Sequence, residues 1–219
     1  MPFALPEISR EAFATALRRL SPAPLDDQAV EALYAHYEEL GRWNQRLSLI
    51  GPGTAEEILS RHYGESLAAL PLVPKGARRG VDVGSGAGFP GLVLAAARPE
   101  MEMTLVEARA RKWSFLLAAA RKASLPCRCL DARVSVPLPA GLPETIDLVT
   151  ARALKLDRHV LGAFAGRLAD EGRILLWVGE QDPELPPDLE PAGESRLEGS
   201  ERRRILVLRR VAPPGPEAE

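Results

Sequence analysis

Cysteine, aromatic residues and long apolar runs are scarce in this chain of 219 residues, and each scarcity excludes a class of protein. The two cysteines, Cys127 and Cys129, stand too close together in PCRCL to bridge readily and are too few for a structural metal site. No apolar run approaches the roughly 20 residues that span a bilayer, and the N-terminus lacks a basic start followed by an apolar core. We therefore expect reduced cysteines, no metal, no membrane association and a cytoplasmic protein.

The chain also has no large excess of positive or negative charge, although its charged residues are unevenly distributed along the sequence. The chain has 28 Lys and Arg against 30 Asp and Glu, so the total charge gives no general attraction to polyanions. Between Glu107 and Arg133 there are seven basic and two acidic residues, whereas residues 180–219 hold ten acidic residues and six arginines. The basic segment is compatible with a nucleic-acid surface and equally with a solvated helix face.

The first seventy residues have the spacing of helices. The segment SREAFATALRRL begins with Ser9 as a candidate N-cap, and in the next segment large apolar side chains recur every three to four residues from Val30 to Leu40. A joint containing Pro and Gly, LPLVPKGARRG, follows. We therefore divide the chain into a helical N-terminal appendage at 1–72, a second domain at 73–211 and a disordered tail at 212–219.

In the second domain, short apolar segments alternate with helical patterns. The expected strands are Gly80–Val83, Met103–Ala108, Cys127–Leu130, Ile146–Ala151, Arg173–Val178 and Arg204–Arg209, and the expected helices are Pro90–Arg98, Lys112–Lys122 and Asp157–Leu168. This alternation predicts an α/β fold with a mostly parallel sheet and helices on both faces. The last strand follows an acidic, Pro-rich loop, so we expect it to pair antiparallel at the edge of the sheet, where its arginines protect the ends.

A glycine-rich turn, GVDVGSGAGFPG, joins the first of these strands to the first of these helices. Gly84, Gly86 and Gly88 follow the strand directly, and a proline suits the first turn of the helix. A bare turn before a helix N-terminus is typical of a nucleotide cradle. In one frame, Gly86, Gly88 and Gly91 also match the dinucleotide pattern G-x-G-x-x-G, so the pattern alone leaves the ligand open.

The acid that precedes the turn separates the candidate ligands. A dinucleotide would place an anionic pyrophosphate on the turn, where the carboxylate of Asp82 would repel it. S-adenosylmethionine (SAM) carries a cationic sulfonium and an ammonium, which Asp82 would attract directly or through water. Glu107, after the second strand, suits the ribose hydroxyls of either ligand. The sequence therefore favours SAM over a dinucleotide, and a purely structural glycine turn is the third interpretation.

The segment VDVGSGAGFPGLVLA carries a family resemblance. It resembles the glycine loop D-x-G-S-G-x-G-F-P-G of the RsmG (GidB) family of bacterial ribosomal RNA methyltransferases, and Gly-Phe-Pro-Gly is its most specific part. The resemblance runs roughly from Tyr34 to Gly179 and includes RWNQRLSLI, SRHYGESL, TLVEARARKWSFL and VTARAL. The chain departs from the family pattern at several positions, including Glu65 for Asp, Ala151 for Ser and Val178 for Lys.

The resemblance implies a fold, a cofactor and a reaction. The fold would be that of a Rossmann-like class I SAM-dependent methyltransferase. The reaction would transfer a methyl group from SAM to N7 of the guanine at position 527, in the 530 loop of 16S ribosomal RNA, either as naked RNA or in a small-subunit particle. Because N7 already has a free lone pair, no general base, nucleophile or metal is required, and the main task of the enzyme is positioning.

The resemblance also implies roles for individual residues. Ala132 and Arg133 follow the third strand, where such folds present backbone to the adenine. Arg152, at the end of the fourth strand, is the first candidate for a catalytic residue that contacts guanine O6 or its phosphate. The expected cofactor-binding residues are Asp82, Gly84, Ser85, Gly86, Gly88, Phe89, Glu107, Ala132, Arg133 and Arg152. Further candidates for RNA contact are Asn44, His62, Arg109 and Lys112.

Several of these residues also have structural interpretations. His62 lies in a helical pattern and is equally well explained as a hydrogen-bonded packing residue. Trp43 is more typical of a core residue that fixes the appendage to the sheet domain than of a base-stacking residue. Phe89 and Pro90 are explained by loop shape or by ligand contact. Two other functions also stay open, a non-catalytic ribosome-binding or assembly protein and a small-molecule methyltransferase. We expect a monomer.

Overall fold

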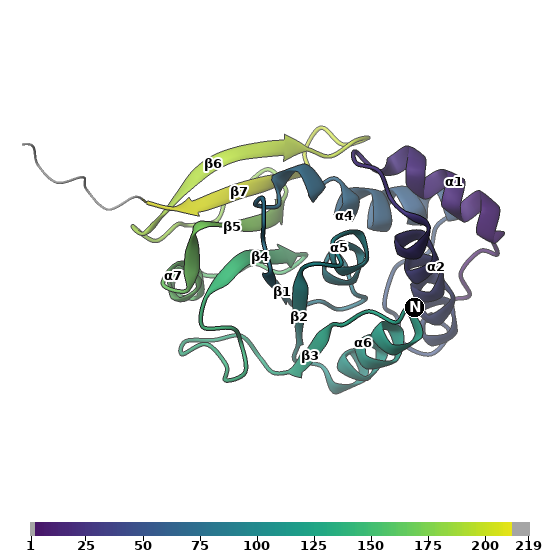
Figure 1. The fold of residues 1–219 in the computed structure, drawn as a ribbon, viewed down its shortest axis with the longest axis horizontal. Coiled ribbons are helices and arrows are strands. Elements are labelled where there is room, and N and C mark those ends of the chain that lie inside the picture. The colour runs from purple at the N-terminus through teal and green to yellow at the C-terminus, as the bar shows by residue number, and fades with distance from the viewer. Residues whose placement is uncertain (1–2, 212–219) are drawn as a thin grey trace, which may run out of the picture.

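The computed structural model describes residues 3–211, and the first part of them is helical as expected (Figure 1). It contains α1 (Arg10–Leu20), α2 (Asp27–Asn44), α3 (Ala55–Ile58), the π-helix η1 (Leu59–Gly64), α4 (Glu65–Leu67) and the 3₁₀-helix η2 (Leu70–Leu72). Ser9 caps α1 by accepting a hydrogen bond from the amide of Ala12, as predicted. The tail expected at 212–219 lies outside the described residues.

The remainder forms a seven-stranded sheet in the order β3-β2-β1-β4-β5-β7-β6. Its strands are β1 (Arg79–Val83), β2 (Glu102–Glu107), β3 (Arg128–Asp131), β4 (Ile146–Arg152), β5 (Leu168–Val178), β6 (Leu189–Arg196) and β7 (Arg204–Arg210). The first five strands are parallel, and β7 is antiparallel to both of its neighbours. The strand order reverses direction between β1 and β4, and in open α/β sheets the carboxyl ends of the strands at such a point are where ligands bind.

Helices cover both faces of the sheet, as the alternating pattern predicted. On one face, α5 (Gly91–Ala97) and α6 (Ala110–Lys122) bury Leu92 and Phe115 against Leu105 of β2. On the other face, α7 (Arg158–Ala165) buries Phe164 with Val81 of β1. Strand β5 contributes to both clusters, with Ile174 and Leu176 in the second and Leu175 in the first, because successive side chains of a strand point to opposite faces.

The prediction that the last strand lies at the sheet edge is wrong. The strand β7 is antiparallel, but it lies between β5 and β6, and β6 forms the edge. The sequence LEPAGESR of β6 contains Pro and Gly and has mostly exposed side chains, so it lacks an alternating apolar pattern. Its pairing with β7 stabilises β6 as a strand, and one contribution is the ion pair between Glu190 and Arg209, which lie opposite each other on the two strands.

The expected boundary between the last helix and the fifth strand is also wrong. Helix α7 ends at Ala165, and β5 begins at Leu168 instead of Arg173. The register of β5 shifts against β4 in this region, so the early part of the strand is irregular. Its polar sequence, ADEG, gave no strand signal, and the local bulge allows those residues to stay in the ladder.

The appendage and the sheet share one hydrophobic core. A single cluster contains Leu33 and Tyr63 from the appendage together with Leu92 and Phe115 from the helices on the sheet. Trp43 also packs on Phe115 at 5.9 Å between ring centroids, as expected for a residue that fixes the appendage in place. The division at residues 72 and 73 stays a prediction, and the core runs across it.

Two other expectations can be compared with the described residues. No helix within residues 3–211 combines the length and the apolar character needed to cross a membrane. Cys127 and Cys129 are free thiols. Burial raises the pKa of Cys127 to about 12 and that of Cys129 to about 11, so both stay protonated at neutral pH.

Candidate functional site

The glycine turn lies directly between β1 and α5, at the carboxyl end of the central strands. Gly84, Gly86 and Gly88 have φ angles of 72°, 55° and 84°, which residues other than glycine rarely adopt. At Gly88 space is also limiting, because a Cβ atom would lie 3.1 Å from Nε2 of His36. The turn therefore presents bare backbone, as a ligand cradle requires.

Asp82, near the end of β1, holds the far end of this turn by a hydrogen bond. Its side chain is fully buried, its Oδ1 accepts a hydrogen bond from the Thr150 hydroxyl at 2.7 Å, and its Oδ2 accepts one from the Gly91 amide at 3.2 Å. Burial raises the pKa of the Asp82 carboxyl to about 6, against the opposing effect of these hydrogen bonds. The structure thus gives Asp82 a role in holding the helix start, and its attraction to a bound ligand stays a prediction.

Glu107 ends β2 and holds the turn from the side. Its two carboxylate oxygens accept hydrogen bonds from the amide of Gly86 at 3.0 Å and from the amide of Arg109 at 2.8 Å. Each oxygen keeps a second lone pair, so the carboxylate can still accept hydrogen bonds from a ribose. The side chain of Lys112 lies near the same turn, since its Nζ would lie 3.8 Å from the Cβ of any residue that replaced Gly86.

His36 joins the appendage to the glycine turn, and it was not among the predicted site residues. It lies fully buried on α2, with Nε2 3.0 Å from the carbonyl oxygen of Ala87 and Nδ1 2.8 Å from the hydroxyl of Tyr63. These partners assign the neutral tautomer in which Nε2–H donates to Ala87 and Nδ1 accepts from Tyr63. Burial lowers the pKa of His36 to about 4. The only signal in the sequence is a histidine on the apolar face of a helix.

The π-helix η1 brings His62 to the same turn. The ring of His62 stacks on Phe89 at 5.0 Å between centroids, with 26° between the planes. Burial, with the nearby charges of Arg152 and Arg61, lowers the pKa of His62 to about 3, so the ring is neutral. Phe89 is itself buried, which favours a packing role in the turn. A π-helix is an irregularity that is often found at functional sites.

Arg152 lies at the end of β4, where it was expected, and its guanidinium is held by the π-helix. It donates to the carbonyl oxygens of Arg61 at 2.7 Å and His62 at 3.3 Å, and it pairs with Glu65 at 3.0 Å. Glu65 is buried and also pairs with Arg203. Burial lowers the pKa of the Arg152 guanidinium. Arg152 therefore fixes the π-helix beside the glycine turn, and any contact with RNA would use its remaining N–H groups.

The other predicted residues separate into two groups. Arg109, Lys112, Ala132 and Arg133 lie at or just after the carboxyl ends of β2 and β3, on the same edge as the glycine turn. Asn44, by contrast, is fully buried: its side chain accepts hydrogen bonds from the amides of Leu49 and Ile50 and donates one to the carbonyl oxygen of Phe3. These bonds give Asn44 a structural role in closing the loop after α2, and its contact with RNA stays a prediction.

The arrangement fits SAM. The turn offers bare backbone where side chains would intrude, Glu107 stands at the end of the neighbouring strand, and a neutral aromatic pair borders the turn. A cation is compatible with this place, since two carboxylates, Asp82 and Glu107, flank the turn. Among the residues that the structure describes, no group of three or more His, Cys, Asp or Glu side chains is placed to hold a metal ion.

Comparison with solved structures shows the same fold. TrmN from Thermus thermophilus matches with a TM-score of 0.53 and 20% identity, over 70% of this chain and 53% of that chain. The complex of MtNAS with MTA and tNA matches with a TM-score of 0.56 and 14% identity, over 93% of this chain and 76% of that chain. A fibrillarin/Nop5p complex matches with a TM-score of 0.56 and 17% identity. These structural matches, at 14–20% sequence identity, show that the chain has a class I methyltransferase fold.

Sequence comparison is more specific. The GidB family, described as rRNA small subunit methyltransferase G, matches residues 29–185. A protein named ribosomal RNA small subunit methyltransferase G from Paramagnetospirillum magneticum is 40% identical over 73% of this chain and 76% of its own length. A protein of the same name from Desulfotalea psychrophila is 36% identical over 84% of this chain and 83% of its own length. The chain belongs to the rRNA small subunit methyltransferase G (GidB) family.

Proposed function

We propose that this protein transfers a methyl group from SAM to N7 of the guanine at position 527 in the 530 loop of 16S ribosomal RNA. The observation that carries the proposal is the glycine turn, in which Glu107 and the backbone from Gly84 to Gly88 form a cradle at the carboxyl ends of β1 and β2. Family membership supports the ribosomal RNA substrate, because the relatives are named for it.

In this proposal the backbone of the turn and Glu107 hold the methionine and ribose parts of the cofactor. Bound SAM would supply the electrophilic methyl group on its sulfonium. Ala132 and Arg133, which directly follow β3, would present backbone to the adenine. The reaction needs no general base, because guanine N7 attacks with its own lone pair, and the protein contributes orientation and exclusion of water.

Some N–H groups of the Arg152 guanidinium bond to η1 and to Glu65. Arg152 would contact the RNA through the remaining N–H groups. A donor on guanine N7 would block the attack, so we assign contact to O6 or to phosphate. Arg109 and Lys112, at the start of α6, extend the positive charge along the same edge of the sheet, which suits a phosphate backbone.

The test is methyl transfer from labelled SAM to 16S RNA and to small-subunit particles that lack the native modification, followed by mapping of the labelled base. We expect label on N7 of the 530-loop guanine. Glu107→Gln should weaken SAM binding measured by calorimetry, and Arg152→Ala should abolish transfer while SAM still binds. Arg158→Ala, on the exposed surface of α7, is the matched control and should behave as wild type.

Three other results would each point elsewhere. Particle binding without transfer would indicate an assembly protein. Methyl transfer that is independent of RNA would indicate a small-molecule methyltransferase. Label on another base would show that the residues departing from the family pattern have changed the target. Each of these results contradicts the proposal.

A further inference from the structure

Leu154 is an apolar side chain exposed to solvent at the border of the glycine turn. Large apolar side chains are exposed at four of the described positions, Leu117, Val136, Leu154 and Val211. Of these, Leu154 alone follows one of the central strands, since it stands two residues after the end of β4, and it is 46% exposed. A single exposed leucine needs no explanation on most surfaces, but the carboxyl ends of the central strands are where ligands bind in such sheets.

The side chain of Leu154 rests on the first glycine of the turn. The Cβ of any residue that replaced Gly84 would lie 2.9 Å from Cδ2 of Leu154. Gly84 directly follows β1 and belongs to the backbone that, in the proposed function, holds the methionine part of the cofactor. Leu154 therefore borders the part of the site in which the methyl group would be transferred.

The backbone holds Leu154 in this exposed position at a cost. Ala153 has a φ angle of 55°, in the left-handed region that residues other than glycine rarely adopt. On one side of it Arg152 is fixed by its bonds to η1, and on the other side Leu156 is buried in the apolar cluster beneath α7. Such strain persists only where the surrounding structure imposes it, and it is often found at binding and active sites.

Positive charge lies next to this apolar side chain. Lys155 directly follows it and is exposed, and so is Arg61, whose backbone carbonyl accepts a hydrogen bond from Arg152. None of the ion pairs among residues 3–211 includes Lys155 or Arg61. Unpaired cations beside an apolar surface suit a nucleotide, because its phosphate is anionic and the face of its base is apolar.

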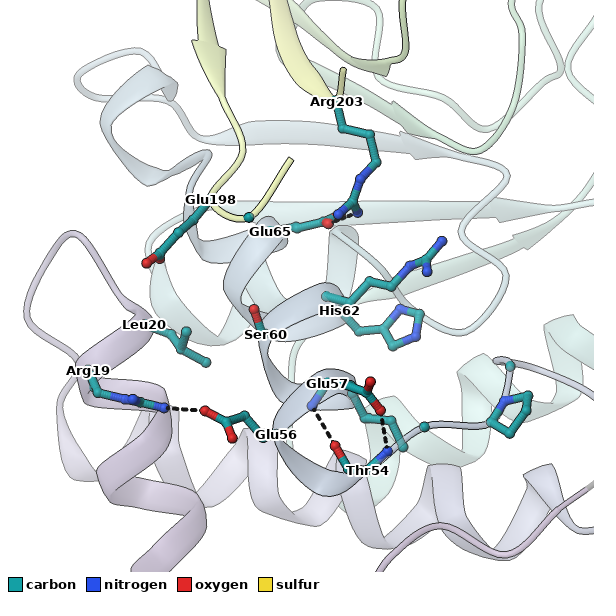
Figure 2. A pocket seen from close by; sticks show the side chains of 16 residues that line it. Arg19, Leu20, Thr54, Glu56, Glu57, Ser60, His62, Glu65, Glu198 and Arg203 are labelled. Carbon is teal, nitrogen blue, oxygen red and sulfur yellow. Dashed lines mark hydrogen bonds and ion pairs between the residues drawn. The ribbon is translucent and has the colours of Figure 1, made fainter. Parts of the chain in front are cut away.

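A polar cleft of about 1020 Å³ also opens beside η1, but it does not lead to the glycine turn (Figure 2). The stacked rings of His62 and Phe89 separate the cleft from the turn. Its residue Arg203 is already paired with Glu65, as the close view shows. The cleft therefore gives a base no route to the cofactor, whereas Leu154 lies at the turn itself.

We propose that Leu154 is the apolar surface on which one face of the target guanine packs. This inference rests on the proposed function and adds the residue that places the base. Enzymes that act on a base turn it out of its stack and hold it against aromatic or apolar side chains. The amino-acid end of SAM is charged and gains little from a leucine, so the base is the better partner for this side chain.

The experiment measures kcat/KM for undermethylated small-subunit particles and, separately, the Kd for SAM by calorimetry. Leu154→Ala should lower kcat/KM about 3- to 15-fold, because about half of a leucine side chain is left for the base to cover, and should change the Kd for SAM less than about twofold. Leu117→Ala, the same substitution at an exposed leucine of α6, is the matched control and should behave as wild type.

Two further variants separate apolar character from size. Leu154→Met keeps the apolar volume and should keep kcat/KM close to that of wild type. Leu154→Gln has a similar length but a polar amide, and it should lower kcat/KM as Leu154→Ala does. Because the side chain is exposed, all three variants should fold, and retained SAM binding shows that they have done so.

Different results would remove different claims. If wild-type protein methylates the particles and Leu154→Ala or Leu154→Gln does so equally well, the inference alone is wrong. If Leu154→Ala weakens SAM binding as much as it lowers kcat/KM, the leucine lines the cofactor instead of the base, and the inference is again wrong. If wild-type protein transfers no methyl group to RNA, the proposed function is wrong and the inference falls with it.

Discussion

The pH dependence of unfolding tests whether His36 is held in its neutral form between the appendage and the glycine turn. Burial lowers the pKa of His36 to about 4, whereas an unfolded histidine titrates near 6.5. Between these values the unfolded state binds a proton that the folded state does not, so stability falls as the pH falls. The difference corresponds to about 3 kcal/mol in total, of which about 2 kcal/mol is lost by pH 5.

Other groups titrate in the same range, so the wild-type curve alone is not decisive. His62 has the same sign as His36, since its pKa is lowered to about 3. Asp82 has the opposite sign: its pKa is raised to about 6, so its contribution to stability increases as the pH falls from 6 toward 3.8. Both groups are present in a His36 variant, and their contributions cancel when the variant is compared with wild type.

The perturbation is His36→Gln, whose amide can still donate and accept where the imidazole did. We expect the free energy of unfolding in urea, followed by circular dichroism, to fall between pH 7.5 and pH 5 by about 2 kcal/mol less in the variant than in wild type. His159→Gln, which replaces an exposed histidine, should leave the wild-type slope unchanged. Parallel curves for wild type and His36→Gln, within about 0.5 kcal/mol, would refute the assignment of a buried neutral imidazole.

Two further predictions concern packing and charge around the turn. Gly91→Ala should destabilise the protein by about 1–3 kcal/mol, because the new Cβ would lie 2.6 Å from Oδ2 of Asp82, whereas Gly179→Ala, which meets nothing within 4 Å, should have little effect; thermal unfolding compares the two. Glu65→Gln should cost about 3 kcal/mol or more in urea unfolding, because it leaves two arginines without their shared carboxylate. Glu184→Gln, which breaks an exposed pair, should cost less than about 1 kcal/mol, and equal losses would contradict the role of burial.

The strand, glycine turn and helix of the cofactor site could be predicted because local rules determine them. An apolar strand, positive φ angles that only glycine adopts readily and a helix start all lie within a dozen residues. The position of Glu107 at the end of the next strand was also predicted correctly. Arg152 was placed correctly at a strand end, but its bonds to the π-helix come from residues 90 positions away in the chain and have no local signal.

Other parts of the site depend on contacts that no short pattern contains. His36 is 51 residues from Ala87, and Thr150 is 68 residues from Asp82, so each pair is formed only by the tertiary fold. Asn44 was predicted to contact RNA from a segment that resembles the family, and its hydrogen bonds to the amides of Leu49 and Ile50, which close a loop, had no signal in the sequence. The edge strand β6 was missed because its pairing, and not its own sequence, makes it a strand.

The continuous core has a consequence for synthesis of the chain. The apolar face of α2 is made early, yet α5 and α6, which carry Leu92 and Phe115 and pack against α2, are translated much later. Until α6 has left the ribosome, Trp43 of α2 lacks Phe115, the ring on which it packs in the folded protein. The early chain is therefore the part most open to chaperones and to aggregation, and its order arrives together with that of the glycine turn.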